Sequence, residues 1–261
     1  MPQRTSYTQG TPCWVDLQTT DPDGARAFYS DLFGWKYDDQ PMGDDQVYSM
    51  AIKDGGHAAA ISPQSPELIA AGVPPMWNTY LAVDDVDATT AKVTAAGGQV
   101  GMEPFDVFDS GRMSFVLDPQ GAAVAFWQAN NHIGASVVNE HGALVWNELT
   151  VPDPAATTGF YEQVLGVTAK TQDYGTGESY TTFEVGDRSV AGATTPNMDG
   201  VPPHWHVYFA VDNVAESAAQ AAALGGTVLA GPLDTPVGPM ATIRDPQGAV
   251  FSLFAAANAQ P

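Results

Sequence analysis

The chain has 261 residues, with 9 Lys and Arg against 30 Asp and Glu, which gives a formal net charge of −21 at pH 7. Nucleic-acid binding relies on Lys and Arg to displace the counterions of the phosphates, so this balance excludes that class. A hydrophobic fraction of 44% supports a folded core, yet no stretch approaches the roughly 20 apolar residues that a membrane helix needs. The polar N-terminus and the single cysteine, Cys13, predict a cytoplasmic protein without a signal peptide or an internal disulfide.

The N-terminal part of the chain predicts a strand, a helix and further strands. Alternating apolar residues over 14–20 indicate a strand, and the following Asp21-Pro22 is typical of the cap and first turn of a helix. That helix has an apolar face and is expected to end at Gly34. Short β-branched or aromatic runs then predict strands at 46–52 and 57–62.

A second unit of the same kind follows. A strand is predicted at 77–83, and a helix over 86–98 begins after Asp84-Asp85 and stops at two glycines. Two more strands are expected, at 112–117 and 122–128. The two units together have the order βαβββ, βαβββ.

Both units recur in the second half of the chain. Residues 14–35 align without gaps on residues 146–167, and PPMWNTYLAVDDV at 74–86 aligns on PPHWHVYFAVDNV at 202–214. The run DPQGA occurs at 118–122 and again at 245–249. Self-similarity at this distance predicts a tandem duplication, with domains at 1–135 and 136–261 joined through the polar stretch near 130–141.

The strand patterns predict which side chains point away from the helices. A strand that precedes a helix packs one face on it, and in 14–20 the apolar set is Val15 and Leu17. The opposite face is polar and aromatic in all four such strands. The side chains expected there are Trp14, Asp16, Asn78 and Tyr80 in the first domain, and Trp146, Glu148, His204, His206 and Tyr208 in the second.

Two of these residues carry the chemistry that a reactive site needs. Glu148 is a candidate general base, and His206 is its candidate partner as an acid or a metal ligand. Edge carboxylates and histidines are also common as ordinary surface residues, and the tryptophans more often pack than bind a ligand. Both interpretations stay open from the pattern alone.

The remaining motifs are less informative. His57, His132 and His141 have no metal-ligand spacing and are expected to be exposed, while Arg112 is suited either to clamping an anionic group or to a surface ion pair. The chain lacks G-x-x-x-x-G-K-[ST], G-x-G-x-x-G and G-x-S-x-G. Nucleotide binding and the usual serine hydrolase chemistry therefore have no support in the sequence.

The order of motifs resembles the glyoxalase/bleomycin-resistance/dioxygenase superfamily, also called vicinal oxygen chelate proteins. The likeness rests on F-Y-x-x-x-x-G at 28–34 and 160–166, on VDD at 83–85 and VDN at 211–213, and on the two DPQGA runs. The first strands, WVDL and WNEL, resemble in particular the tandem two-domain glyoxalase-like members. The resemblance implies an α+β fold in which each pair of βαβββ units forms a curved mixed sheet around a cleft.

The resemblance also locates the metal ligands of metal-dependent relatives. These places fall at Trp14, Asn78 and Ala125 in the first domain and at Trp146, His206 and Ser252 in the second. His206 alone is a good ligand, and a divalent ion normally takes three or more protein ligands. The usual metal site is therefore not expected, although a divalent cofactor held by Glu148, His204 and His206 with water is an alternative.

Three functions follow as hypotheses. The first is a metal-independent protein that binds a small molecule in its aromatic clefts, similar to the drug-sequestering branch of the superfamily, with a negative field that favours cationic ligands. The alternative is a metal-dependent glyoxalase-like lyase or dioxygenase with its site in the second domain. The third is a protein-interaction role with vestigial clefts. Because two domains are already present, a monomer is expected, with a homodimer as the other possibility.

Overall fold

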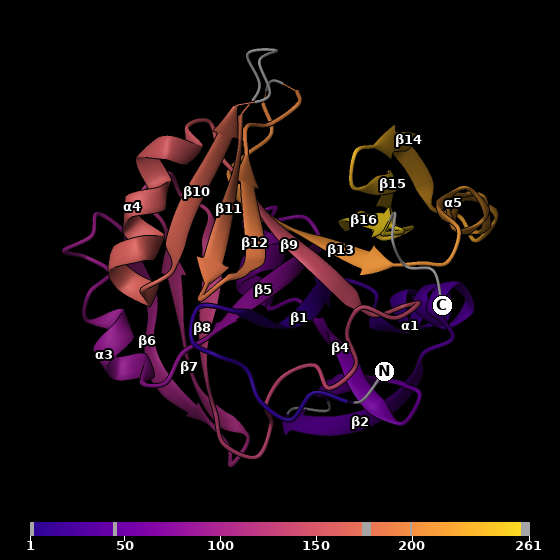
Figure 1. Cartoon of the computed structure of the whole chain (residues 1–261). Helices are drawn as coiled ribbons and strands as arrows, with labels where there is room; N and C mark the ends of the chain where they lie inside the picture. Colours follow the sequence, from indigo (N-terminus) through magenta and orange to yellow (C-terminus); the bar gives the residue numbers. More distant parts are fainter. Residues whose placement is uncertain (1–2, 44–45, 174–178, 199, 257–261) are drawn as a thin grey trace.

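The computed structural model describes residues 3–43, 46–173, 179–198 and 200–256, and most of these lie in two sheets (Figure 1). The first sheet contains β1 (Pro12–Thr19), β2 (Lys36–Gly43), β3 (Gln46–Lys53), β4 (Gly56–Pro63), β5 (Met76–Ala82), β6 (Gln99–Val107), β7 (Gly111–Leu117) and β8 (Ala123–Ala129). The second contains β9 (Leu144–Thr150), β10 (Thr168–Asp173), β11 (Ser179–Val185), β12 (Arg188–Thr194), β13 (His204–Ala210), β14 (Thr227–Thr235), β15 (Gly238–Arg244) and β16 (Val250–Phe254). The helices are α1 (Pro22–Phe33), α2 (Pro66–Ala70), α3 (Val86–Thr90), α4 (Pro154–Leu165) and α5 (Val214–Ala223).

The two sheets have the same topology. Their strand orders are β2-β3-β4-β1-β5-β8-β7-β6 and β10-β11-β12-β9-β13-β16-β15-β14. In each, two βαβββ units join through one central antiparallel pair, β1 with β5 and β9 with β13, and parallel pairs flank it. The predicted α+β fold of two tandem domains, each built from two βαβββ units in a mixed sheet, is therefore confirmed. The expected boundary at 135/136 lies in the segment between β8 and β9.

The first helix of each domain begins and ends on the residues that the sequence indicates. The Asp21 side chain accepts a hydrogen bond from the Gly24 amide, Asp153 does the same for Ala156, and a proline follows each cap. Both helices end at a glycine in the left-handed conformation, Gly34 with φ 72° and its copy in the second domain with φ 75°. The duplicated sequence thus yields duplicated helices.

The helix predicted over 86–98 is shorter than expected. α3 ends at Thr90, and residues 91–97 form successive turns. The sequence at the end of α3 and just after it contains Thr89, Thr90, Val93 and Thr94, whose β-branched side chains lose rotamer freedom in a helix. Its copy, α5, is rich in alanine and continues for 10 residues. The two helices therefore differ in length because their residue types differ in helix propensity.

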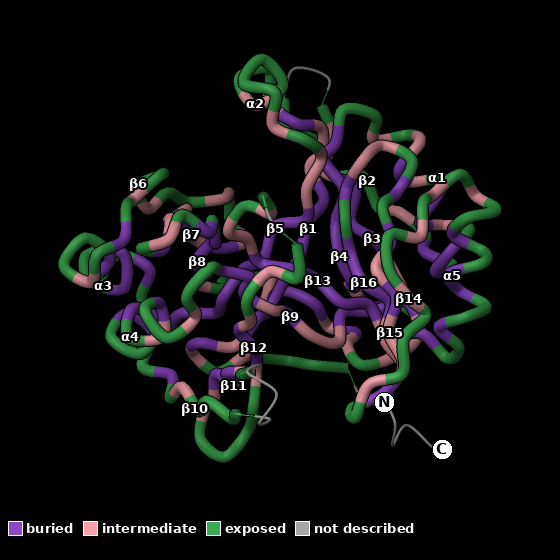
Figure 2. The backbone as a smooth tube through the Cα atoms, turned by 90° about the horizontal axis from the view of Figure 1, so that it is seen from above, coloured by how far each residue is buried: buried purple, intermediate pink, exposed green. Residues whose placement is uncertain are grey.

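The two domains share their hydrophobic cores. One cluster joins β1, α1 and β4 to β13, α5, β15 and β16, and the other joins β5, α3, β7 and β8 to β9, α4, β11 and β12. Accordingly α1 lies beside α5 and α3 beside α4 (Figure 1). Burial follows the central strands of both sheets and falls off at the edge strands β2, β6, β10 and β14 (Figure 2). Each sheet therefore uses its helix-bearing face to pack against the other domain.

The motifs that repeat in the sequence bind one domain to the other. The Tyr29 hydroxyl donates to Asp245 Oδ2 at 2.9 Å and accepts from Trp77 Nε1 at 3.1 Å. In the reciprocal arrangement Tyr161 donates to Asp118 Oδ2 at 3.1 Å and accepts from an indole of its own domain. The tyrosine of each F-Y run thus bonds to the aspartate of the other domain's DPQGA run, and all four residues are buried. These motifs form a pair of reciprocal interdomain locks.

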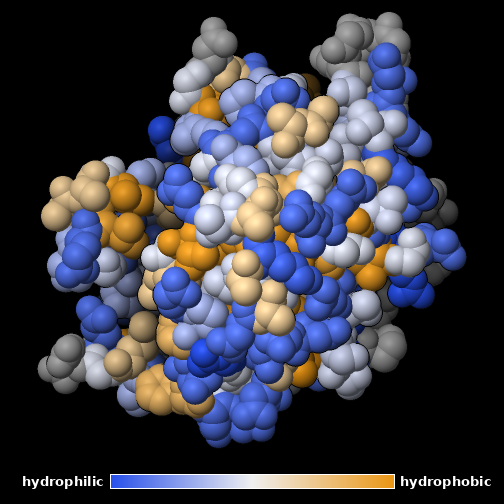
Figure 3. Space-filling model, turned by 90° about the vertical axis from the view of Figure 1, so that its left-hand side faces the viewer, coloured by the Kyte–Doolittle hydropathy of each residue, from blue (hydrophilic) through white to orange (hydrophobic). Residues whose placement is uncertain are grey.

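The outer surface over α3 and α4 is mainly hydrophilic, with small hydrophobic patches between the polar side chains (Figure 3). This is the expected exterior of helices that bury their apolar sides on a sheet. Among the described residues, no helix is both long and apolar enough to cross a membrane.

Candidate functional site

Each sheet has a second face that carries no helix, called here the helix-free face. In the first domain the pairing of β1 with β5 sets Trp14 opposite Tyr80 and Asp16 opposite Asn78. In the second, β9 and β13 set Trp146 opposite Tyr208 and Glu148 opposite His206. The structure therefore brings the predicted residues together domain by domain. His204 stands beside His206, with ring centroids 5.7 Å apart.

The carboxylate of Asp16 is the centre of a closed polar cluster in the first domain. It accepts hydrogen bonds from Asn78 Nδ2 at 2.8 Å, from the Tyr80 hydroxyl at 2.7 Å and from the Tyr48 hydroxyl at 3.0 Å. Trp14 Nε1 donates to the same Tyr48 hydroxyl at 2.8 Å. Asp16 is only 2% exposed, and burial raises its pKa although the three donors oppose the shift.

This cluster is covered by apolar side chains from the rest of the domain. Trp14 is 3% exposed, and the His132 ring packs edge-on against it with centroids 4.6 Å apart. His57 and His132 are both half-buried rather than exposed as the sequence predicted, because the segment after β8 folds back over β1. The buried apolar side chains of this cluster are Cys13, Trp14, Met50, Ala60, Tyr80, Ala82, Met113, Ala125, Trp127 and Ala135. The four predicted residues of the first domain thus lie in a packed interior.

The corresponding cluster of the second domain is open to solvent. Glu148 accepts from the Tyr180 hydroxyl at 2.8 Å and from the Tyr208 hydroxyl at 2.9 Å. Trp146 Nε1 donates to Tyr180 at 2.9 Å, as Trp14 does to its tyrosine. Glu148, Trp146 and Tyr180 are all partly exposed. Burial raises the pKa of Glu148, opposed by the two tyrosine donors, so this carboxyl titrates closer to neutrality than a free one.

A neutral histidine lies opposite this carboxylate. His206 Nε2 and the Ser252 hydroxyl share a hydrogen bond of 2.8 Å, and the Ser252 hydroxyl lies 3.1 Å from the Thr242 hydroxyl. Burial, assisted by the neighbouring His204, lowers the pKa of His206 to about 3. His204 Nδ1 donates to the Pro202 carbonyl at 2.9 Å, and burial lowers its pKa as well. The site therefore combines a carboxylate, two phenols and an uncharged imidazole.

Sequence reasoning missed Tyr48 and Tyr180. They lie on β3 and β11, which do not precede a helix. The outward-facing side chains were predicted only for strands that precede a helix. Their signal is in the duplication itself, because the two tyrosines stand 132 positions apart, the same spacing as Trp14 and Trp146. Arg112, left open between two roles, forms ion pairs with Asp87 and Asp106.

The donor set does not fit the metal of metal-dependent relatives. The places that the resemblance assigns hold Trp14, Asn78 and Ala125, and then Trp146, His206 and Ser252, of which only His206 is a good ligand. Within the described ranges, no group of three or more His, Cys, Asp or Glu side chains is placed to hold an ion.

The paired βαβββ units with one sealed and one open helix-free face define a two-domain glyoxalase-like protein. The sequence profile of the Glyoxalase/Bleomycin resistance protein/Dioxygenase superfamily matches residues 12–126 and again 141–253. The chain belongs to this superfamily.

Relatives of known sequence span the whole chain. This chain is 54% identical over 262 residues to a Mycobacterium tuberculosis protein named "Putative glyoxylase CFP32", with 100% of both chains covered. It is 37% identical over 264 residues to the anthracycline biosynthesis protein DnrV of Streptomyces peucetius, covering 95% of this chain and 94% of that one.

Solved structures share the fold at low identity. A Mn(II)-bound glyoxalase from Novosphingobium aromaticivorans is 19% identical with a TM-score of 0.66, covering 98% of this chain and 83% of that one. The 2,3-dioxygenase LapB from Pseudomonas sp. KL28 is 16% identical with a TM-score of 0.68, covering 98% and 97%.

Proposed function

We propose that the protein binds a small molecule on the helix-free face of its second domain, without a metal at the family's ligand positions. The observation that carries this proposal is Glu148, a partly exposed carboxylate fixed by two tyrosine hydroxyls and facing an uncharged His206. A buried or fully paired carboxylate has no capacity left for a ligand, and Asp16 is in that condition. Glu148 retains acceptor capacity on the exposed side.

The lining favours an aromatic ligand with hydroxyl or amine donors. Trp146, Tyr180 and Tyr208 form a chain of hydrogen bonds to the carboxylate, and a cluster of aromatic side chains suits a planar molecule. A carboxylate binds most strongly to a donor that carries a positive charge. The likeness to a protein named for anthracycline biosynthesis supports an oxygenated aromatic ligand, and the net charge of −21 supports a cationic group on it.

Isothermal titration calorimetry tests the proposal with an anthracycline that carries an amino sugar, with its neutral aglycone and with a panel of cationic and neutral metabolites. We expect saturable binding that Glu148→Gln and Tyr180→Phe each weaken about 10-fold, because each removes one charge-assisted hydrogen bond. Tyr48→Phe is the matched control in the first domain and is expected to leave the affinity unchanged. The absence of saturable heat with every probe, or an equal loss with Tyr48→Phe, would contradict the proposal.

A second candidate function is catalysis at the same site. Its support is the raised pKa of Glu148 beside a neutral imidazole, a pairing suited to proton abstraction from a bound substrate. A metal-dependent lyase or dioxygenase would in addition hold a stoichiometric ion at Glu148, His204 and His206, and His206→Ala would abolish its activity. Elemental analysis after reconstitution with Zn²⁺, Ni²⁺, Mn²⁺ and Fe²⁺ separates the two, since we expect no retained metal.

We also propose that the chain works as a monomer in the reducing cytoplasm. The monomer is supported by the helix-bearing faces, which each sheet buries against the other domain of the same chain. The location is supported by Cys13, the chain's single cysteine, which is a buried free thiol. Light scattering coupled to size exclusion reports the mass, and a homodimer would contradict the first part.

A further inference from the structure

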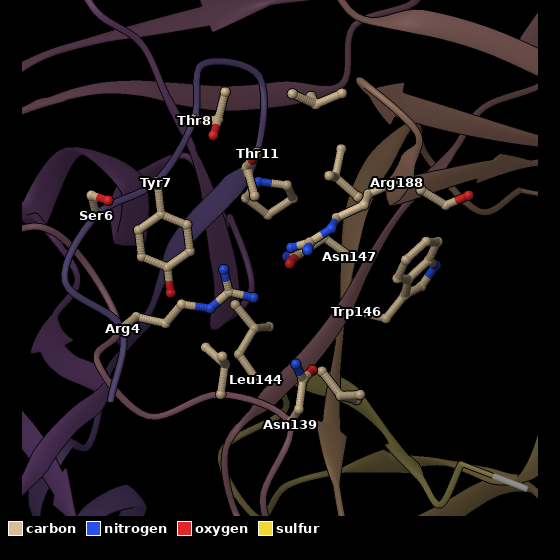
Figure 4. Close-up of a pocket in the computed structure, with 16 residues that line it drawn as sticks. Arg4, Ser6, Tyr7, Thr8, Thr11, Asn139, Leu144, Trp146, Asn147 and Arg188 are labelled. Atoms are coloured by element: carbon tan, nitrogen blue, oxygen red, sulfur yellow. The ribbon is translucent and has the colours of Figure 1, made fainter. Parts of the chain in front are cut away.

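A cavity of about 420 Å³ lies where the N-terminal segment passes the start of the second sheet (Figure 4). Its walls are residues of four segments, at 4–12, 138–139, 144–147 and 185–190. This volume is within the range of roughly 300 to 1,000 Å³ that small-molecule sites occupy. The cavity shares Trp146 with the candidate site, but Glu148, His206 and Tyr208 are not part of its lining.

Two arginines face this cavity without a carboxylate partner among the described residues. Figure 4 shows the guanidinium groups of Arg4 and Arg188 pointing toward one another from opposite walls. In the part of the chain that the structure describes, neither forms an ion pair with Asp or Glu, although the sequence has 30 of these residues. By contrast Arg26 and Arg112 are each paired with carboxylates. The positive charges of these two exposed arginines repel each other, and an anion between them relieves that repulsion.

The wall that carries Arg4 is held in place by bonds to both domains. The Arg4 amide donates to the Ser136 carbonyl at 2.8 Å, and the Tyr7 hydroxyl donates to the Ala135 carbonyl at 2.5 Å. Further along, Gln9 Nε2 donates to the Leu165 carbonyl at 3.0 Å. The Arg4 guanidinium also lies over the Tyr7 ring, 5.6 Å from its centroid. The cavity is therefore bounded by an anchored segment and not by a loose terminus.

The equivalent place in the first domain has neither the space nor the charge. Gly56 stands 132 positions before Arg188, and a Cβ on it would meet Ser136 Oγ at 2.5 Å and Val137 Cγ2 at 2.6 Å. The Ser136 hydroxyl accepts from the His57 amide at 2.8 Å, which closes the segment onto β4. The first domain therefore lacks a matching cavity, and the strand position of Arg188 carries no charge there.

We propose that this cavity binds a small organic anion, with its carboxylate held between Arg4 and Arg188 and its apolar part against Trp146. Guanidinium groups bind carboxylates through two parallel hydrogen bonds, which gives both affinity and orientation. The rest of the lining suits polar groups of such a ligand, since the hydroxyls of Ser6, Thr8 and Thr11 can donate or accept hydrogen bonds. On a surface that repels anions overall, a local pair of cations is required for one to bind.

The test is calorimetric titration of the full-length protein with 2-naphthoate and with 2-naphthamide, its neutral counterpart. We expect the naphthoate to bind at least 10-fold more tightly than the amide, and its affinity to fall as NaCl is raised. Arg4→Gln and Arg188→Gln should each weaken naphthoate binding by about 10-fold or more. Arg244→Gln is the control, because Arg244 is an exposed arginine of the same domain outside the cavity lining.

The outcomes separate this proposal from the function proposed above. Glu148→Gln should leave naphthoate binding unchanged, because Glu148 is not in the cavity lining. Equal binding of naphthoate and naphthamide, no heat with naphthoate, or a loss with Arg244→Gln equal to that with Arg188→Gln would each overturn the proposal. Circular dichroism of each variant confirms that a loss of binding is not a loss of folding.

Discussion

The two helix-free faces began as copies and now differ in what surrounds the same polar core. Each has a tryptophan whose indole bonds to a tyrosine, and each tyrosine bonds to an acid on the first strand of its domain. In the first domain this acid is Asp16, sealed at 2% exposure, whereas Glu148 in the second is partly open. The same hydrogen-bond pattern is therefore present on a buried face in the first domain and on a partly exposed face in the second.

Neighbouring register positions explain the difference. Next to the acid, Ala60 and Met50 of the first sheet correspond to Gly192 and Thr182 of the second. Next to the second tyrosine, Ala125 and Phe115 correspond to Ser252 and Thr242. Apolar residues in one copy are thus replaced by polar or smaller ones in the other. The duplication allows one face to stabilise the fold while its copy remains available to a ligand.

The largest difference between the two faces is expected when each acid is removed in turn. Asp16→Ala leaves three donors, on Asn78, Tyr80 and Tyr48, without their acceptor at a buried position, and is expected to cost about 3 kcal/mol of unfolding free energy. Glu148→Ala is expected to cost about 1 kcal/mol or less, because Tyr180 is partly exposed and water can take the place of its acceptor. Urea unfolding of both variants measures the difference. Equal losses would mean that the second face is as closed as the first.

The next test exchanges His206 for the residue of the first domain, as His206→Asn. The pKa of His206 in the folded protein is about 3, below the unfolded value near 6.5, so the unfolded chain binds the extra proton between these values. Stability is therefore lost as the pH falls from 6.5. The variant has no histidine to protonate at this position, so at pH 5 it should gain up to about 2 kcal/mol of unfolding free energy relative to the parent protein. At pH 7 this gain should be absent. Unfolding at the two pH values checks this, and a difference that does not change with pH would contradict a buried neutral histidine.

A smaller effect is expected where the two halves remain equivalent. Tyr29→Phe and Tyr161→Phe each remove a buried interdomain hydroxyl, so that one oxygen of an aspartate and one indole N–H lose this partner. Each should cost about 1.5 kcal/mol of unfolding free energy, with the two costs nearly equal. Thermal unfolding measures both. A large inequality would show that the asymmetry of the helix-free faces extends into the interdomain locks.

The sequence predicted the features that show as repeats or as alternating patterns. It predicted fewer of the features that depend on contacts between distant segments. The duplication, the helix caps and the outward side of strands β1, β5, β9 and β13 follow from local patterns and were predicted. That the first face is filled depends on Met113 and His132, which come from a distant strand and from the interdomain segment. The cavity between Arg4 and Arg188 likewise depends on the path of the N-terminal segment, which no local periodicity encodes.

The finest distinction between the faces is the single methyl group that separates Ala60 from Gly192. A Cβ at position 192 would collide with the Tyr180 hydroxyl, so glycine is required for that tyrosine to reach Glu148. Gly192→Ala should displace Tyr180 and break its bond with Trp146 Nε1, while changing the unfolding free energy by less than about 1 kcal/mol.

Indole Nε1–H resonances in nitrogen-15 NMR spectra report both sides of this comparison in one sample. The Trp146 signal should shift in Gly192→Ala because it loses its tyrosine acceptor, and the Trp14 signal should stay in place because its bond to Tyr48 lies on the unaltered face. If Trp146 is unperturbed, the tyrosine has room to move without leaving Glu148. In that case the missing methyl group is not what keeps the second face in its open arrangement, and the polar replacements at Thr182 and Ser252 carry the difference by themselves.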